Sequence, residues 1–351
     1  MKVAVVYNEA FPGIKNQYQT KFPKNLPFKP YFDYYESDPI AEYESIAEHL
    51  RQVGFDCYIL NILDNIDIFL SDLKKNKPDA VFNFVEIYKN VAEWEKGFAG
   101  LVELMRVPYT GAPPMGLGTC QSKVLTKKIL SSIGIRTPRF VYLEQPQKLY
   151  RFKLNYPLIV KPALEDASAG IDVDAVVTNY KKLKSRINYI FQEFKQPVLI
   201  EEYIEGRELN VAVFGDDNPK VLPISEIDFT KMPAHLPNIV SFQAKWNPLH
   251  EVYHKTIPKC PARLTKKIRA EAERIALAAF KTTGCRDYCR VDMRLSKDNE
   301  LYVLEVNPNP DLTEDAGFMR SMSEAGYSYG EALKAIVDLA IERGEKAAVN
   351  H

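Results

Sequence analysis

The chain has 351 residues, enough for two or three compact domains with a large buried core. Lys and Arg together number 46, as do Asp and Glu, so the zero net charge excludes a global field that attracts nucleic acid or an anionic membrane. The apolar runs are far shorter than the roughly 18 to 20 residues that cross a bilayer, and no signal-peptide pattern opens the sequence. We expect a cytoplasmic protein without membrane or nucleic-acid partners. Its five cysteines fit no disulfide or zinc spacing and are expected to be reduced thiols.

The first third of the chain alternates apolar strands with a helical pattern. Three runs read as strands and one as a helix: residues 2 to 7, 57 to 60 and 80 to 84, and residues 40 to 53. This alternation predicts an open, parallel α/β domain at residues 1 to 113. The aromatic stretch at residues 9 to 39 is too long for an ordinary connection. A loop over a substrate cleft or a partner subunit, and plain surface packing, both stay open as interpretations.

Lysines in the middle of the chain suit a phosphate-binding site. Lys127 lies on a helix predicted at residues 122 to 132, and Lys161 ends a buried strand, where a charge is costly unless it meets a counter-charge. The loop at residues 163 to 170 contains small residues such as Ser168, which allow backbone N–H groups to approach phosphate oxygens. This pattern suits a triphosphate, although most lysines at strand ends simply reach water.

Acidic residues close the next strand. Glu201 and Glu202 end it, and Ile204 and Glu208 follow shortly after. The chain at this point can offer hydrogen bonds to the edge of an adenine, and a carboxylate can bind ribose hydroxyls. A solvated acidic turn is the simpler alternative.

The polar, aromatic segment at residues 242 to 254 is predicted to be a loop. Its Lys245 suits a mobile lid that excludes water and brings one lysine to the leaving phosphate. His250 and His254 are interpreted as surface residues rather than metal ligands, because no helical pattern places them together.

The most informative residues belong to a predicted β-hairpin near the C-terminus. Two alternating runs, residues 289 to 295 and 301 to 307, flank a polar turn. Antiparallel pairing about that turn places Asp292 across from Glu305 and Arg290 across from Asn307, all on one face.

Opposed carboxylates on neighbouring strands repel each other unless a cation lies between them. Asp292, Glu305 and Asn307 supply the oxygen ligands that Mg²⁺ prefers, and Mg²⁺ held by a few carboxylates commonly also binds phosphate. The hairpin therefore predicts a metal site that serves a nucleotide. The alternative is a surface hairpin whose carboxylates are neutralised by Arg290 and Arg294.

Taken in order, these features resemble the ATP-grasp superfamily, most closely its D-alanine–D-alanine ligase-like branch. The likeness runs from Val107-Pro108-Tyr109-Thr110-Gly111 to the last predicted helix, at residues 329 to 343. It implies an α/β (α+β) architecture in which the open parallel domain precedes two α+β domains, at residues 114 to 200 and 201 to 351, that enclose the nucleotide. It also implies ATP-dependent amide formation from a carboxylic acid and an amine through an acyl phosphate, with release of ADP and phosphate.

The resemblance also implies a role for each candidate residue. Two Mg²⁺ ions, with Mn²⁺ as a substitute, are expected beside the ATP. ATP is assigned to Lys127, Lys161, Glu201, Glu202, Ile204 and Glu208, the metal ions to Asp292, Glu305 and Asn307, and the catalytic roles to Arg290, Lys245 and Ser168.

The amino-acid positions of this branch differ in the present sequence. Tyr7-Asn8-Glu9 stands where the D-alanine enzymes carry Gly-Gly-x-Ser-x-Glu, and Ala316 replaces the serine that contacts the second carboxylate. We infer a ligase whose small-molecule acid and amine, amino acids or peptides, are not two D-alanines. The alternatives are a D-alanine–D-alanine ligase proper, with Glu9 or Glu86 in place of the missing glutamate, and a nucleotide-binding partner protein without turnover. A homodimer is one assembly that the resemblance allows.

Overall fold

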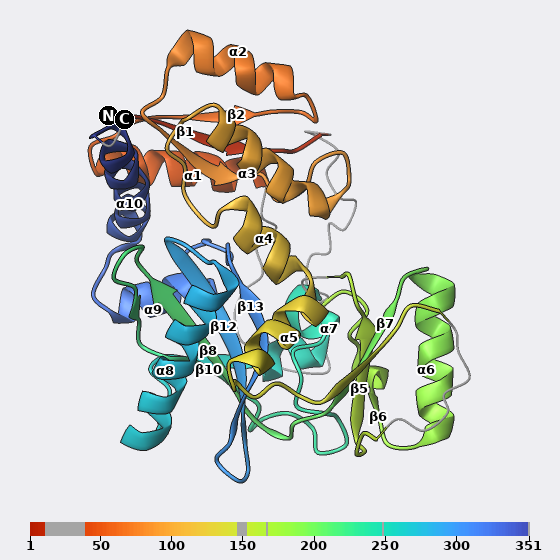
Figure 1. Cartoon of the computed structure of the whole chain (residues 1–351). Helices are drawn as coiled ribbons and strands as arrows, with labels where there is room; N and C mark the ends of the chain where they lie inside the picture. Colours follow the sequence, from red (N-terminus) through yellow and green to blue (C-terminus); the bar gives the residue numbers. More distant parts are fainter. Residues whose placement is uncertain (11–38, 146–152, 166–167, 248, 350–351) are drawn as a thin grey trace.

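The computed structural model of the protein contains three β-sheets, which follow one another along the chain (Figure 1). The structure describes all residues except 11–38, 146–152, 166–167, 248 and 350–351. The prediction for the aromatic stretch at residues 9 to 39 therefore lies almost entirely outside the described residues. In the described part of the chain, no helix is both long enough and apolar enough to cross a membrane.

The first sheet is open and parallel, as predicted. Its strand order is β2-β1-β3, with β1 (Lys2–Tyr7) in the centre, β2 (Asp56–Asn61) and β3 (Ala80–Phe84). Apolar runs form buried parallel strands because helices cover both faces of such a sheet. Those helices include α1 (Pro39–Gln52), α2 (Ile66–Asn76) and α3 (Glu95–Leu104), with the short η1 (Ala92–Trp94) before α3.

The second sheet is antiparallel and follows two helices that cross from the first sheet. These are α4 (Pro114–Gln121) and α5 (Lys123–Ser132). The strand order is β4-β7-β5-β6, with β4 (Phe140–Leu143), β5 (Leu158–Pro162), β6 (Val176–Val177) and β7 (Val198–Glu202). Helix α6 (Tyr180–Glu193) packs its apolar side on one face, and η2 (Val173–Ala175) precedes β6. The other face, which carries Lys161 and Glu201, is turned toward α5.

The third sheet carries the predicted hairpin. Its order is β11-β10-β8-β12-β13, with β9 paired to β8. The strands are β8 (Gly206–Phe214), β9 (Lys220–Val221), β10 (Ser225–Asp228), β11 (Ile257–Lys259), β12 (Tyr288–Ser296) and β13 (Leu301–Asn307). Helix α8 (Lys266–Thr283) buries its apolar side against this sheet.

The last two helices return to the first sheet. Helix α9 (Gly317–Glu324) and helix α10 (Tyr329–Val349) share one buried core with β1 and α1. Figure 1 shows the consequence, since α10 lies beside α1 at the first sheet. The division at residues 113 and 200 stays a prediction, and α10 packs with the first segment although it is last in sequence.

The segment at residues 242 to 254 is more ordered than a loop. It contains α7 (Phe242–Trp246), capped by the Ser241 side chain, and the 3₁₀ turn η3 (Glu251–Lys255), capped by His250. His254 is buried, so its interpretation as a surface residue is wrong. The helical spacing is too short to register in the sequence, because each element spans only five residues.

Candidate active site

The hairpin of β12 and β13 has the pairing that the sequence predicts. Asp292 lies opposite Glu305, and Arg290 lies opposite Asn307. A bulge follows, so that Met293 pairs with Val303 and the register shifts by one residue. The four polar residues lie on the same side of the bulge and on one face of the sheet. Alternation alone was therefore sufficient to place them.

Asp292 is the centre of a buried hydrogen-bond network. Arg290 donates from Nε and Nη2 to its two carboxylate oxygens, at 2.8 and 2.9 Å. The Asn307 amide donates to Oδ2 at 2.9 Å, and the Asn210 amide donates to Oδ1 at 2.7 Å. The alternative of a surface hairpin is wrong because Asp292 and Arg294 are both buried. Arg290 does neutralise Asp292, as that alternative required.

The two opposed carboxylates differ in their electrostatic surroundings. Burial raises the pKa of Asp292 above its ordinary value, against the opposing effect of the Arg290 guanidinium. Burial also acts to raise the pKa of Glu305, but Lys123, Lys161 and Arg290 outweigh it and lower that pKa to about 2. Glu305 is therefore ionised throughout the neutral range, and a cation is favoured beside it.

The donor set fits a hard divalent ion. Two carboxylates and one carboxamide meet on adjacent strands within a buried region, and oxygen ligands of this kind suit Mg²⁺ or Mn²⁺. Among the described residues, no three His, Cys, Asp or Glu side chains gather as a metal centre. Such an ion would consequently depend on Asn307 and on oxygens from outside the protein, such as those of a phosphate.

One carboxylate of the second sheet, that of Glu201, contacts a lysine of α5 and a lysine of β5. Lys127 Nζ lies 2.8 Å from Oε1 of Glu201, and Lys161 Nζ lies 3.0 Å from its Oε2. All three side chains are buried, and Lys127 also donates to the carbonyl oxygen of Leu304 in β13 at 3.2 Å. Burial lowers the pKa of Lys127, although the Glu201 charge opposes this shift. The lysines predicted to bind phosphate thus lie together next to β13, which carries the predicted metal ligands Glu305 and Asn307.

The remaining residues predicted for the nucleotide have different surroundings. Both lysines contact the Glu201 side chain. The contact predicted between Glu201 and adenine would therefore have to come from the Glu201 backbone. Glu202 accepts a hydrogen bond from the backbone N–H of Asn155 at 2.8 Å. Glu208 lies in the third sheet, 2.9 Å from the guanidinium of Arg294, and burial raises its pKa. The solvated acidic turn is therefore excluded for Glu201 and Glu208, which are both buried.

Ser168 of the predicted phosphate loop contacts the chain just before the predicted lid. Ser168 has a left-handed backbone (φ 64°), and its hydroxyl donates to the carbonyl oxygen of Val240 at 3.0 Å. Gly170 is also left-handed, and a Cβ at that position would lie 2.5 Å from Pro162 Cγ, so only glycine fits. Lys245 Nζ lies 5.0 Å from the ring centre of Trp246. A role of Lys245 at the phosphate stays a prediction.

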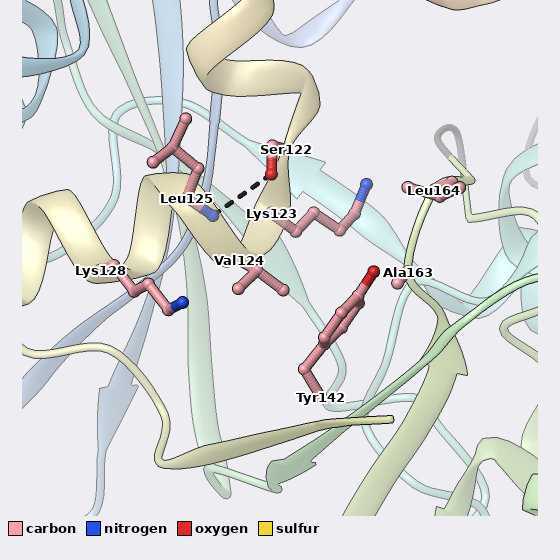
Figure 2. Close-up of a pocket in the computed structure, with 8 residues that line it drawn as sticks. All are labelled: Ser122, Lys123, Val124, Leu125, Lys128, Tyr142, Ala163 and Leu164. Atoms are coloured by element: carbon pink, nitrogen blue, oxygen red, sulfur yellow. Dashed lines mark hydrogen bonds between the residues drawn. The ribbon is translucent and has the colours of Figure 1, made fainter. Parts of the chain in front are cut away.

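Three residues near the site were not assigned from the sequence. Asn210 lies opposite Asp292 in β8, and Arg294 pairs with Glu208. Lys123 lines a cavity with Tyr142 and residues 163 and 164 (Figure 2). Sequence signals existed for two of them, because Asn210 is two residues after Glu208 in a strand and Lys123 is one helical turn before Lys127.

Comparison with known proteins shows the family to which the chain belongs. The family model described as the D-ala D-ala ligase C-terminus matches residues 129–338, which include both sheets of the site. The chain belongs to the D-alanine–D-alanine ligase family. It is thus an ATP-grasp protein and an ATP-dependent ligase that forms C–N bonds, as the sequence predicts.

Several known proteins are similar to this chain over most of their length. A D-alanine–D-alanine ligase of Carboxydothermus hydrogenoformans is 30% identical, with 86% of this chain and 93% of that protein covered. One of Bordetella petrii is 32% identical, with coverage of 84% and 85%. An uncharacterized protein of Sinorhizobium fredii, y4sG, is 30% identical over 98% of both chains. The Bacillus anthracis D-alanine–D-alanine ligase complexed with ATP shares the fold, with a TM-score of 0.72, 22% identity and 99% coverage of both chains.

Proposed function

We propose that this ligase joins an amino acid or peptide to an amine-bearing partner other than a second D-alanine. In the first step a carboxylate oxygen of the acid attacks the γ-phosphorus of ATP, and ADP leaves. In the second step the amine attacks the acyl carbon, loses a proton, and displaces phosphate. Overall, ATP, an acid and an amine become ADP, phosphate and an amide.

The buried basic residues support the phosphoryl-transfer step. An attacking carboxylate and a triphosphate are both anions, so positive charge has to surround the place where they meet. Lys127 and Lys161 share the carboxylate of Glu201, and both lysines lie close to the predicted phosphate position. Arg290 lies on the same face as the metal-ligating residues and can stabilise the transferred group. Ser168 belongs to the predicted phosphate loop, and Lys245 is assigned to the lid that closes over the transferred group.

Asp292, Glu305 and Asn307 would hold the Mg²⁺ ions. A divalent ion there would supply charge neutralisation for the triphosphate. The ionised state of Glu305 supports this assignment, since a carboxylate with a pKa of about 2 needs no deprotonation to bind a cation. Arg290 would then share the carboxylate of Asp292 with the metal ion.

The amine site supports a substrate pair different from two D-alanines. Ala316 stands at the N-cap of α9 and caps it with no side-chain hydrogen bond. A methyl group cannot donate to a carboxylate as a serine hydroxyl would. At the acid site, Glu9 follows β1, and its backbone is held by Asn61 through two hydrogen bonds of 3.0 Å. This part of the proposal depends on Ala316, which stands where a serine is expected.

Formation of D-alanyl-D-alanine is the second candidate. The Carboxydothermus hydrogenoformans and Bordetella petrii relatives carry that name, and Glu9 lies where a carboxylate could accept an amino group. Incubation with ATP, Mg²⁺ and D-alanine distinguishes the two. If D-alanyl-D-alanine forms as fast as the product of any other acid and amine, the second candidate is favoured over the first.

The test is phosphate release coupled to substrate pairs. Amino acids and small amines are screened with ATP and Mg²⁺, and we expect release only when both an acid and an amine are present. The Asp292→Asn variant should lose about 100-fold or more of this activity, because it weakens the metal site. The matched control is Asp298→Asn in the exposed turn of the same hairpin, which should retain wild-type activity. Full activity of Asp292→Asn would refute the assigned metal site.

The cytoplasmic location, the homodimer and the absence of nucleic-acid partners stay predictions. Size-exclusion chromatography with light scattering at micromolar protein concentration tests the assembly directly.

A further inference from the structure

Arg294 is a buried cation on the polar face of the third sheet. It stands two residues after Asp292 in β12, so the alternation of a strand places both side chains on one face. Its cross-strand neighbour in β8 is Glu208, and the Arg294 side chain is only 4% exposed. Burial of a guanidinium is costly unless acceptors and an opposite charge surround it. The groups that surround Arg294 therefore bear on its role.

Three oxygen acceptors hold the Arg294 guanidinium. Its Nη2 lies 2.9 Å from Oε2 of Glu208 and donates a hydrogen bond to the backbone carbonyl oxygen of Asn238. Its Nη1 donates to the backbone carbonyl oxygen of Gly206, the first residue of β8, at 3.1 Å. The planar guanidinium presents its donors in a fixed fork, so contacts on both terminal nitrogens fix its orientation. Glu208 is consequently held by a group that is itself immobilised.

Two aromatic rings add to this fixation. The guanidinium carbon of Arg294 lies 5.8 Å from the ring centre of Tyr203 and 5.4 Å from that of Phe229. Aromatic rings attract a cation within about 6 Å, and arginine commonly packs on them. Tyr203 directly follows β7 and precedes Ile204, in the segment that is predicted to contact the adenine. Arg294 thus connects that segment to the carboxylate of Glu208.

Glu208 can accept hydrogen bonds from a sugar while it contacts Arg294. The resemblance assigns Glu208 to the nucleotide, and a carboxylate at this point suits the ribose hydroxyls. An ionised carboxylate offers about four acceptor positions on its two oxygens, so the contact at Oε2 leaves capacity for two hydroxyl donors. The strength of those hydrogen bonds depends on their angles. A carboxylate whose orientation is already fixed also loses less rotational freedom when it binds.

We propose that Arg294 is a positioning residue for the nucleotide: it fixes the carboxylate of Glu208 in the orientation that accepts the ribose hydroxyls, and thereby sets the preference of the protein for a ribose nucleotide. The role rests on the proposed function only in requiring that ATP binds, and it is independent of which acid and amine are joined. Ribose selectivity, and not nucleotide binding as a whole, should therefore depend on Arg294.

Calorimetric titration with two nucleotides tests this role without any acid or amine. Mg–ADP carries both ribose hydroxyls, and the Mg complex of 2′,3′-dideoxy-ADP carries neither. We expect the wild type to bind Mg–ADP about tenfold or more tightly than the dideoxy nucleotide, because hydrogen bonds to a charged group are lost. Arg294→Met keeps the aliphatic stem and removes the guanidinium. In this variant the ratio should fall to about threefold or less, while the affinity for the dideoxy nucleotide stays within about twofold of the wild type.

The matched control is Arg207→Met. Arg207 precedes Glu208 in β8 and points to the opposite face, where it pairs with Glu226 at 2.6 Å with its side chain 39% exposed. This variant should keep the wild-type ratio within about twofold. Arg294→Lys retains the positive charge and lacks the fork, so its ratio should lie between those of the wild type and Arg294→Met.

A purely structural role of Arg294 would weaken the binding of both nucleotides equally. Equal weakening in Arg294→Met, or a wild type that binds the two nucleotides with the same affinity, would overturn the proposal. If Arg294→Met does not fold, Arg294→Lys decides: a ratio below that of the wild type supports the role, and the wild-type ratio refutes it. Wild-type protein that prefers Mg–ADP as expected but joins no acid to an amine would count against the proposed function, not against Arg294.

Discussion

At the scale of single residues, the site contains carboxylates that each contact several basic or amide side chains. Glu201 serves two lysines, and Asp292 accepts hydrogen bonds from an arginine and two amides. Each ion is buried, so its cost is offset only while all its partners are present. The same arrangement gathers Lys127, Lys161 and Arg290 around the predicted phosphate position, which suits a ligand that carries several negative charges.

Replacement of Glu201 tests this sharing of charge. Glu201→Gln leaves Lys127 and Lys161 without their counter-charge, and the free energy of unfolding should fall by about 3 to 5 kcal/mol at neutral pH. Urea denaturation measures it. The neighbouring Glu202→Gln is the control, because Glu202 pairs with a mostly exposed Arg139 and should change stability by less than about 1 kcal/mol. Equal losses in both variants would contradict the shared-charge interpretation.

The same residue predicts a pH dependence. Burial acts to raise the pKa of Glu201, but Lys127 and Lys161 outweigh it and hold the pKa below the ordinary value. A carboxylate whose pKa is lower in the folded state stabilises the fold above the unfolded pKa, about 4.3, and that contribution disappears as the pH falls through the folded pKa. Below about pH 4, the melting temperature should therefore fall more steeply with decreasing pH for the wild type than for Glu201→Gln. Equal slopes for the two proteins would exclude the lowered pKa of Glu201.

At the scale of elements, three adjacent strands and one helix position the site. Strands β8, β12 and β13 place Asn210, Asp292 and Glu305 side by side, and α5 brings Lys127 against β13. Helix α4 fixes this arrangement because it packs against the end of α8. Gly116 of α4 lies so close to Gly284 that no larger residue fits between the two backbones.

Two glycines of α4 make a matched test of that packing. A Cβ at Gly116 would lie 2.3 Å from the carbonyl oxygen of Gly284, whereas one at Gly118 would lie 3.3 Å from the flexible end of Lys96. Gly116→Ala should therefore lower the free energy of unfolding by about 1 to 3 kcal/mol. Gly118→Ala should be neutral or stabilising by up to about 1 kcal/mol, because alanine favours the helix. Chemical denaturation of both variants gives the comparison. A stable Gly116→Ala would show that α4 can shift without cost.

At the scale of the whole molecule, the last helix ties the first and third sheets together. Arg343 of α10 binds both carboxylate oxygens of Asp287, at 2.6 and 3.1 Å, and the backbone carbonyl of Tyr109 at 2.6 Å. Asp287 is fully buried just before β12 and also accepts from the backbone N–H of Gly111 at 2.8 Å. The segment that leaves the first sheet, the start of β12 and the last helix thus meet at one buried charge.

Loss of that arginine should weaken the whole fold. Arg343→Met leaves Asp287 buried without its main counter-charge, and the free energy of unfolding should fall by about 3 kcal/mol. Differential scanning calorimetry should show the melting temperature falling with it. The control is Lys346→Met on the same helix, whose partner Asp217 is exposed, and its melting temperature should stay unchanged. A wild-type melting temperature for Arg343→Met would indicate that the sheets are held together without this contact.

The hairpin shows how much of the site the sequence determined by itself. Arg290, Asp292, Glu305 and Asn307 are separated by one short turn, so a period of two and a constant index sum were enough to pair them. The same holds for the strands of the first sheet and for α5 and α8, whose apolar periodicity is local. The bulge after Asp292 and the five-residue helix α7 were too small to leave a periodic signal.

Tertiary structure alone decided which side chains meet across the sheets. Glu201 follows Lys127 by 74 residues and Leu304 follows it by 177, and no local pattern reveals that these groups touch. Alternation tells which face of a strand is polar, but it does not tell which strand or helix lies opposite that face. For the same reason, the return of α10 to the first sheet, with Arg343 on Asp287, could only be seen once the chain was folded.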